Sequence, residues 1–128
     1  MVAKYFGAIP RGPVNDPAQA DVPVLKQDIR KVMKDQVAAT SIDKYYSVPG
    51  ITDRDLTALT VGANILGGLA SSRLDNMLVR DEQIAVGVSA SNYAFQRVGI
   101  LNLGATVRPG VEIETVEKRL DEIIAQYI

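Results

Sequence analysis

The stretch Ile65–Val86, "ILGGLASSRLDNMLVRDEQIAV", decides the fold of this chain. A helical pattern runs into Gly67 and Gly68, and two serines then precede a second short helical pattern and an alternating segment. We predict that the paired glycines end the first helix, because one of them can adopt the left-handed conformation. Ser71 or Ser72 then caps a short second helix, after which a strand begins.

The helix that enters this corner is predicted within residues 51–68, "ITDRDLTALTVGANILGG". Thr52 or Asp53 can cap its first turn, and Thr52 with Asp55 resembles a capping box. Apolar residues occupy most sides of this helix, so we expect it to be buried on most sides. A second amphipathic helix is predicted at residues 111–128, where one face carries Val116, Leu120, Ile123, Ile124 and Tyr127.

Strands are predicted before and after the two central helices. Residues 26–33 and 36–47 favour a strand pair through their Val, Ile, Thr and Tyr content, and Pro49 ends the second strand. Residues 83–95 and 97–109 alternate apolar and polar side chains, which predicts an antiparallel hairpin.

The resulting order β-β-α-α-β-β-α indicates an α+β fold, in which helices cover one face of an antiparallel or mixed sheet. Residues 1–23 carry four prolines in the run "GAIPRGPVNDPAQADVP" and are interpreted as an extended connector. Residues 24–128 then form the sheet and helices of a single domain.

Composition excludes several classes of function. The net charge of −1 gives no electrostatic case for nucleic acid or for an anionic membrane, and no apolar run is long enough to span a bilayer. The chain has no Cys and no His, which excludes thiolate nucleophiles, a Ser-His-Asp triad and the H-x-x-E-H zinc motif. The acidic residues are scattered, so no metal site is predicted. An enzyme that uses Asp, Glu, Ser and Tyr alone stays open as a minor alternative.

The Gly-Ser-Arg corner does not fit a nucleotide site. "GANILGG" lacks the Lys and hydroxyl residue of a phosphate loop, and a helix precedes it where a strand is needed. A structural corner is the simpler interpretation, with Arg73 paired to a nearby acid or a helix-terminal carbonyl. Met77 is interpreted as a core residue, Asp75 as a capping residue, and Tyr45 and Tyr46 as residues that pack on the sheet.

Four stretches resemble one known family. They are "KYFGAIPRGP", "YYSVPG", "DRDLTALTVGANILGGLASSRLDNMLVRDEQIAVGVSAS" and "GILNLGATVRPGVEIETVEKRLDEII". In this order they are similar to the pitrilysin/insulinase family of zinc metallopeptidases, which includes the mitochondrial processing peptidases. The family builds a chamber for unfolded peptides from paired α+β domains, and one domain carries H-x-x-E-H and zinc.

A silent domain of that family can contribute an Arg and a Tyr, seven residues apart, that hold substrate near the metal. The matching stretch here is "LVRDEQIAV", in which Val79 stands at the Arg position and Val86 at the Tyr position. Arg80 is one residue out of register. The resemblance therefore implies an inactive domain without catalytic or metal-binding residues of its own.

The resemblance also implies partners. Zinc is expected in a separate catalytic domain or subunit of the same protease, with peptide or unfolded polypeptide as substrate. The strand and helix that usually precede "KYFG" are missing, which implies part of a domain. The candidate site is a structural corner or a piece of the chamber lining, formed by Gly67, Gly68, Ser71, Ser72 and Arg73.

The residues leave one alternative from another class of function. A self-standing interaction module could form a homodimer through its sheet or its C-terminal helix. The two interpretations differ in exposed apolar surface, because an incomplete domain exposes the surface that its absent elements would cover. Bacterial members of the family are often exported, which weakly favours the periplasm over the cytoplasm, although composition leaves the compartment undecided.

Overall fold

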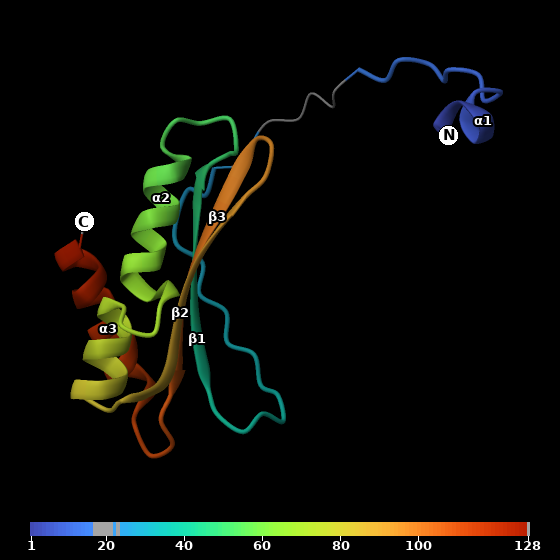
Figure 1. The fold of residues 1–128 in the computed structure, drawn as a ribbon. Coiled ribbons are helices and arrows are strands. Elements are labelled where there is room, and N and C mark those ends of the chain that lie inside the picture. Colours follow the sequence, from blue (N-terminus) through green and yellow to red (C-terminus); the bar gives the residue numbers. More distant parts are fainter. Residues whose placement is uncertain (17–21, 23, 128) are drawn as a thin grey trace.

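The structure of the chain is a computed structural model that describes residues 1–16, 22 and 24–127 (Figure 1). Its elements in chain order are α1 (Val2–Phe6), β1 (Ser41–Pro49), α2 (Leu56–Ala63), η1 (Asn64–Gly68), η2 (Asp75–Asp81), β2 (Ala85–Ala94), β3 (Val98–Val107) and α3 (Ile113–Tyr127). The elements η1 and η2 are short π-helical turns. The predicted α+β class is confirmed.

The sheet has three antiparallel strands in the order β1-β3-β2, so β3 is central and the other two strands lie at its edges. The predicted hairpin is confirmed: the N–H of Phe95 donates to the carbonyl of Val98 at 2.9 Å and closes the turn between β2 and β3. Leu103 of β3 faces Lys44 on one side and Ala90 on the other. The alternation of apolar residues in β3 therefore gives a buried face.

The strand predicted at residues 26–33 is wrong, and the one predicted at 36–47 begins later, at Ser41. Residues 26–33 have no regular structure, and Ile29, Val32 and Met33 are exposed. A β-favouring composition forms a strand only where a neighbouring strand offers hydrogen bonds. No described strand pairs with these residues, and the segment contacts α3 through an ion pair of Arg30 with Glu117 at 2.9 Å.

The helical elements α2, η1, η2 and α3 lie together on one face of the sheet (Figure 1). Leu103 of β3 meets Leu74, Leu78 and Leu120 in a fully enclosed cluster. The predicted inner face of the C-terminal helix is confirmed, because its apolar residues Val116, Leu120, Ile123 and Ile124 are all buried. One ion pair fixes this helix over the sheet edge, where Lys44 of β1 donates to Asp121 at 2.6 Å.

The expectation that the first central helix is buried on most sides is wrong. Only Ala63 of α2 is buried, together with Leu66 and Gly67 of η1. On the outer side, Val61, Ile65 and Leu69 are 51%, 45% and 59% exposed. Val61 and Ile65 lie four residues apart on α2 and η1, and Leu69 follows directly after η1 with an extended backbone. We call these three residues the outer stripe.

The predicted capping box of this helix does not form. The N-cap residue of α2 is Asp55, and its side chain makes no capping hydrogen bond. The carboxylate of Asp53 instead accepts the backbone N–H of Asp55 at 2.9 Å, which closes an Asx turn just before the helix. The polar residues before the helix therefore do form a local hydrogen bond, but this bond stabilises the turn that precedes the helix and not its first turn.

A β-bulge changes which side chains of β2 face the core. Alternation predicts that Val86 shares a face with Val88, but the register shifts between Ala85 and Gly87. Ala85 is fully buried as a result, and Val86 is half exposed. A bulge inserts one extra residue into a strand, so it reverses the alternation on one side of it.

The N-terminal segment lies apart from the sheet (Figure 1). Residues 2–6 form the short helix α1, none of whose residues is buried, and residues 7–16 have no helix or strand beyond a turn. The connector expected at residues 1–23 thus contains a helical turn, and its residues 17–21 and 23 lie outside the described residues. No helix of the described chain is long and apolar enough to cross a membrane.

The enclosed leucine cluster predicts that truncation of a buried leucine costs far more stability than truncation of an exposed one. Leu120→Ala removes a fully buried side chain and should lower the free energy of unfolding by about 2–5 kcal/mol. Leu69→Ala truncates an exposed residue of the outer stripe and should change it by less than about 0.5 kcal/mol. Urea unfolding followed by circular dichroism compares the two variants. Equal losses would contradict the location of the core.

Candidate functional site

The Gly-Ser-Arg corner lies where η1 ends against the edge strand β2. The glycines were predicted to adopt the left-handed conformation, and this is wrong: positive φ among the described residues occurs only at Gln83 and Gly110. Gly67 is needed for a different reason. A Cβ there would lie 3.0 Å from the Cβ of Ala90 and 3.1 Å from its backbone nitrogen. The absence of a side chain lets the helix backbone approach the strand closely.

Gly68 fills the second tight position of the corner. A Cβ there would lie 2.6 Å from the side-chain oxygen of Asn64, one turn earlier in η1. Because the amide of Asn64 can rotate, this restriction is weaker than the one at Gly67. The pair of glycines therefore sets the distance between η1 and β2.

The serines of the corner do not cap the second helix with their hydroxyls. Ser71 is exposed, and its carbonyl accepts the side-chain N–H of Asn76 at 3.1 Å. Ser72 is 3% exposed, and its hydroxyl has no hydrogen-bond partner among the described residues. Its carbonyl accepts the backbone N–H of Asn76 at 3.0 Å. Ser72 is thus a small core residue whose backbone starts the helix.

Arg73 does not make the expected pair with an acid or a carbonyl. Its guanidinium lies 5.2 Å from the ring centre of Tyr127, a cation–π contact with the end of α3. The hydroxyl of Tyr127 donates to the carbonyl of Gly62 in α2 at 3.3 Å. Tyr127 therefore joins the corner to two helices. Sequence reasoning placed this tyrosine on the inner face of a helix but did not predict its contact with the corner.

Arg80 makes the contacts that were expected of Arg73. Its Nε donates to Asp75 at 2.7 Å, and its Nη2 donates to the carbonyl of Ala70. Asp75, predicted to cap the helix, is the acidic partner in this ion pair. Arg80 thereby connects η2 to the chain just after η1.

Residues 78–86, the stretch that matches the family's Arg and Tyr positions, are held by an ion pair between Glu82 and Arg119 of α3. Arg119 of α3 donates from Nε to both carboxylate oxygens of Glu82, at 2.9 and 3.0 Å, and from Nη1 to Glu122 at 2.7 Å. Hydrogen bonds first from Glu82 and then from Glu122 raise the pKa of Arg119 above its ordinary value. The pair anchors the turn at Gln83, whose φ of 53° is left-handed. Val79 and Val86 flank this turn with apolar side chains.

A groove of about 480 Å³ runs between the free edge of β2 and the α2–η1 helix. Residues 88–93 of β2 line one wall, and Thr60, Asn64, Gly67 and Gly68 line the other. Hydrogen bonding alternates along an antiparallel strand, and Phe95 bonds to Val98. The backbone groups of Val88, Ala90 and Asn92 therefore point to the free edge. The groove thus presents unpaired main-chain groups at Val88 and Asn92, whereas Gly67 lies against the backbone nitrogen of Ala90 between them.

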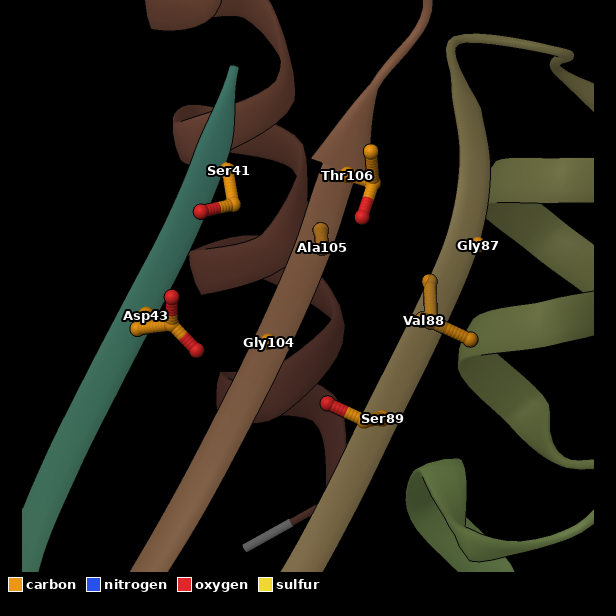
Figure 2. A pocket seen from close by; sticks show the side chains of 8 residues that line it. All are labelled: Ser41, Asp43, Gly87, Val88, Ser89, Gly104, Ala105 and Thr106. Atoms are coloured by element: carbon orange, nitrogen blue, oxygen red, sulfur yellow. The ribbon is translucent and has the colours of Figure 1, made fainter. Parts of the chain in front are cut away.

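The opposite face of the sheet has no helix over it among the described residues, and it holds a second hollow of about 200 Å³ (Figure 2). Gly104 forms its floor. In Figure 2 the side chains of Asp43 and Ser89 stand on either side of this glycine, one from each edge strand. We call this hollow the Asp43 recess.

The donor atoms of the chain do not fit a zinc site. The sequence has no His and no Cys, and the described residues include no group of three acidic side chains placed to hold a metal ion. No step of a zinc-dependent reaction can therefore be assigned to the side chains of this chain.

Comparison with known proteins decides the family. Over residues 1–128 the chain matches the family described as Peptidase M16 inactive domain. The chain belongs to this family. It is a non-catalytic domain of M16-family proteases, as the resemblance in its sequence implied, and the expectation that it has no activity of its own agrees with this assignment.

Solved structures have the same fold. A protease from Helicobacter pylori shares 25% sequence identity over 73% of this chain, with a TM-score of 0.69. A peptidase M16 inactive domain from Pseudomonas fluorescens shares 23% identity over 68% of the chain, with a TM-score of 0.63. The chain spans 22% and 21% of these two proteins. A search of curated proteins found no match.

The close approach at Gly67 predicts a strong effect of a single methyl group. Gly67→Ala should lower the free energy of unfolding by about 1–3 kcal/mol, because its Cβ presses on the backbone of β2. Gly87→Ala, in β2 and with open space around the glycine, should change the free energy of unfolding by less than about 0.5 kcal/mol. Denaturant unfolding measures both. A tolerated Gly67→Ala would show that η1 does not depend on this contact.

The ion pair at the Gln83 turn gives a second prediction. Glu82→Gln removes the charge that Arg119 binds through two nitrogens, and it should lower the thermal midpoint of unfolding. Glu114→Gln changes an exposed glutamate in the first turn of α3 and serves as the control. Calorimetry at low and high salt compares them, and the difference should shrink in high salt. A midpoint that falls equally in both variants would contradict a specific role for Glu82.

Proposed function

We propose that this chain walls the peptide chamber of a zinc metalloprotease and supports hydrolysis by a separate zinc-bearing domain. Its family membership and its donor set both support a non-catalytic role beside such a domain. The observation that carries the proposal is the groove along the free edge of β2. An extended polypeptide can be held there without any reacting group of this chain.

The groove suits peptides of varied sequence. Main-chain hydrogen bonds to an exposed strand edge give affinity without selecting side chains. Val88 and Asn92 present their backbone groups to the groove on either side of Ala90, where Gly67 comes close. A bound segment would therefore pair at two separate points along β2. Such binding fits an unfolded polypeptide as the substrate.

The outer stripe is the surface that we assign to the partner domain. Val61 of α2, Ile65 of η1 and Leu69 directly after η1 are exposed apolar side chains. Exposed apolar patches of this kind mark contact surfaces. If the zinc-bearing domain docks on the outer stripe, the β2 groove lies beside the interface between the two domains.

The same stripe favours a second candidate function, self-association of this chain as an interaction module. In that case two copies would cover the outer stripe of each other, and no peptidase role would follow. The two candidates differ in the partner that the stripe selects. Analytical ultracentrifugation of the chain alone and with the zinc-bearing domain separates them.

The proposal predicts association through the stripe. The chain, inert alone, should bind the zinc-bearing domain of the same protease and raise its rate of peptide hydrolysis. Val61→Asp places a charge in the stripe and should weaken the association at least about tenfold, since a buried unpaired charge is costly. Val24→Asp, in an exposed irregular segment, is the matched control. Titration followed by fluorescence anisotropy and peptide cleavage measures both effects.

Three outcomes would contradict the proposal. The first is hydrolysis by the isolated chain, and the second is a failure to associate with the zinc-bearing domain. The third is a stable dimer of the chain alone that Val61→Asp dissolves, which would favour the interaction module.

A further inference from the structure

The uncovered face of the sheet carries hydroxyl, amide and exposed aromatic side chains and a single charge. Strand register brings Ser41, Asp43, Tyr45 and Ser47 of β1 to this face, opposite Thr106, Gly104, Asn102 and Ile100 of β3. From β2 the same face receives Ser89, Ser91 and Tyr93. Asp43 and Lys44 are the charged residues of the three strands, and Lys44 points to the helix side, where it binds Asp121. Asp43 is thus the one charged side chain that the three strands place on this face.

Gly104, at the floor of the recess, leaves room for the two side chains that border it. A Cβ at Gly104 would lie 2.7 Å from the hydroxyl of Ser89 and 3.0 Å from a carboxylate oxygen of Asp43. These two side chains, from the two edge strands, therefore lean over the centre of β3, as Figure 2 shows.

The carboxylate of Asp43 is oriented but not neutralised. Its Oδ1 accepts a long hydrogen bond of 3.4 Å from the side-chain nitrogen of Asn102, and no ion pair reaches it from the described residues. Its second oxygen makes no hydrogen bond within the described chain. The hydroxyl of Thr106 lies on the rim of the same recess. The set therefore offers one anionic acceptor and two neutral ones.

We propose that the Asp43 recess binds the guanidinium group of an arginine side chain in an extended peptide. A guanidinium presents donors in a planar fork that matches a carboxylate, and its remaining N–H groups can donate to hydroxyl oxygens such as that of Ser89. A metal ion fits less well, because the recess supplies one carboxylate only. The identification of this peptide as a protease substrate rests on the proposed function, whereas the binding itself does not.

The test is a titration of the isolated, ¹⁵N-labelled chain with three short peptides that differ at one residue. The central residue is arginine, lysine or the neutral isostere citrulline, and its neighbours are alanines with blocked ends. The amide signals of Gly104 and Ser89 report binding. The arginine peptide should bind at least about tenfold more tightly than the citrulline peptide, the difference expected for one charge-assisted pair.

Two substitutions locate the site. Asp43→Asn keeps the shape of an exposed side chain and should weaken arginine-peptide binding about tenfold. Asp28→Asn makes the same charge change in an exposed segment away from the sheet face and should leave affinity within about twofold. Unchanged spectra of the free variants confirm that both are folded.

Equal binding of the arginine and citrulline peptides, or an unaffected Asp43→Asn, would overturn the assignment. Equal binding of the lysine peptide would overturn the preference for guanidinium. Either failure is distinct from a failure of the proposed function, which depends on association with the zinc-bearing domain through the outer stripe.

Discussion

The contact between the backbone of Gly67 and Ala90 of β2 is the constraint on which the rest of the structure depends. Any side chain at Gly67 would meet the strand at about 3 Å, so the helix can lie this close only because the residue is glycine. The contact brings η1 to the edge of the sheet, buries Leu66 beside Ala90 and turns the chain toward η2. It also forms one wall of the groove along β2, and it therefore links a packing requirement to the surface that we assign to peptide binding.

One-sided burial explains the distribution of surfaces. The helices cover the face that carries Leu103 and Ala105, and the described residues place no helix on the other face. That other face can therefore keep serines, a threonine and an unpaired carboxylate at no cost in burial. The outer stripe adds three exposed apolar side chains on the helix side of the sheet. The domain thus presents three distinct surfaces: the outer stripe, the free edge of β2 and the open sheet face that holds Asp43.

Sequence reasoning was accurate where a signal is local and periodic. The hairpin of residues 85–107 and the inner face of α3 followed from the alternation of side chains and from the 3.6-residue period. It was wrong where the outcome depends on a distant neighbour. Residues 26–33 have strand-like composition but no described partner strand. Arg73 contacts Tyr127, fifty-four positions away in the chain, while Arg80 makes the local ion pair. The bulge at Ala85–Gly87 reverses an alternation that looked regular.

The sequence by itself determined the class of the fold, the family and the absence of a zinc-binding donor set. These follow from side-chain chemistry and spacing, which need no coordinates: a chain without His or Cys cannot supply the ligands of H-x-x-E-H. Only the tertiary structure decided why the paired glycines are needed, which arginine closes the corner, and which face of the sheet stays open. Each of these depends on distances between residues far apart in the chain. Close packing of the whole domain sets those distances, so a local sequence pattern cannot predict them.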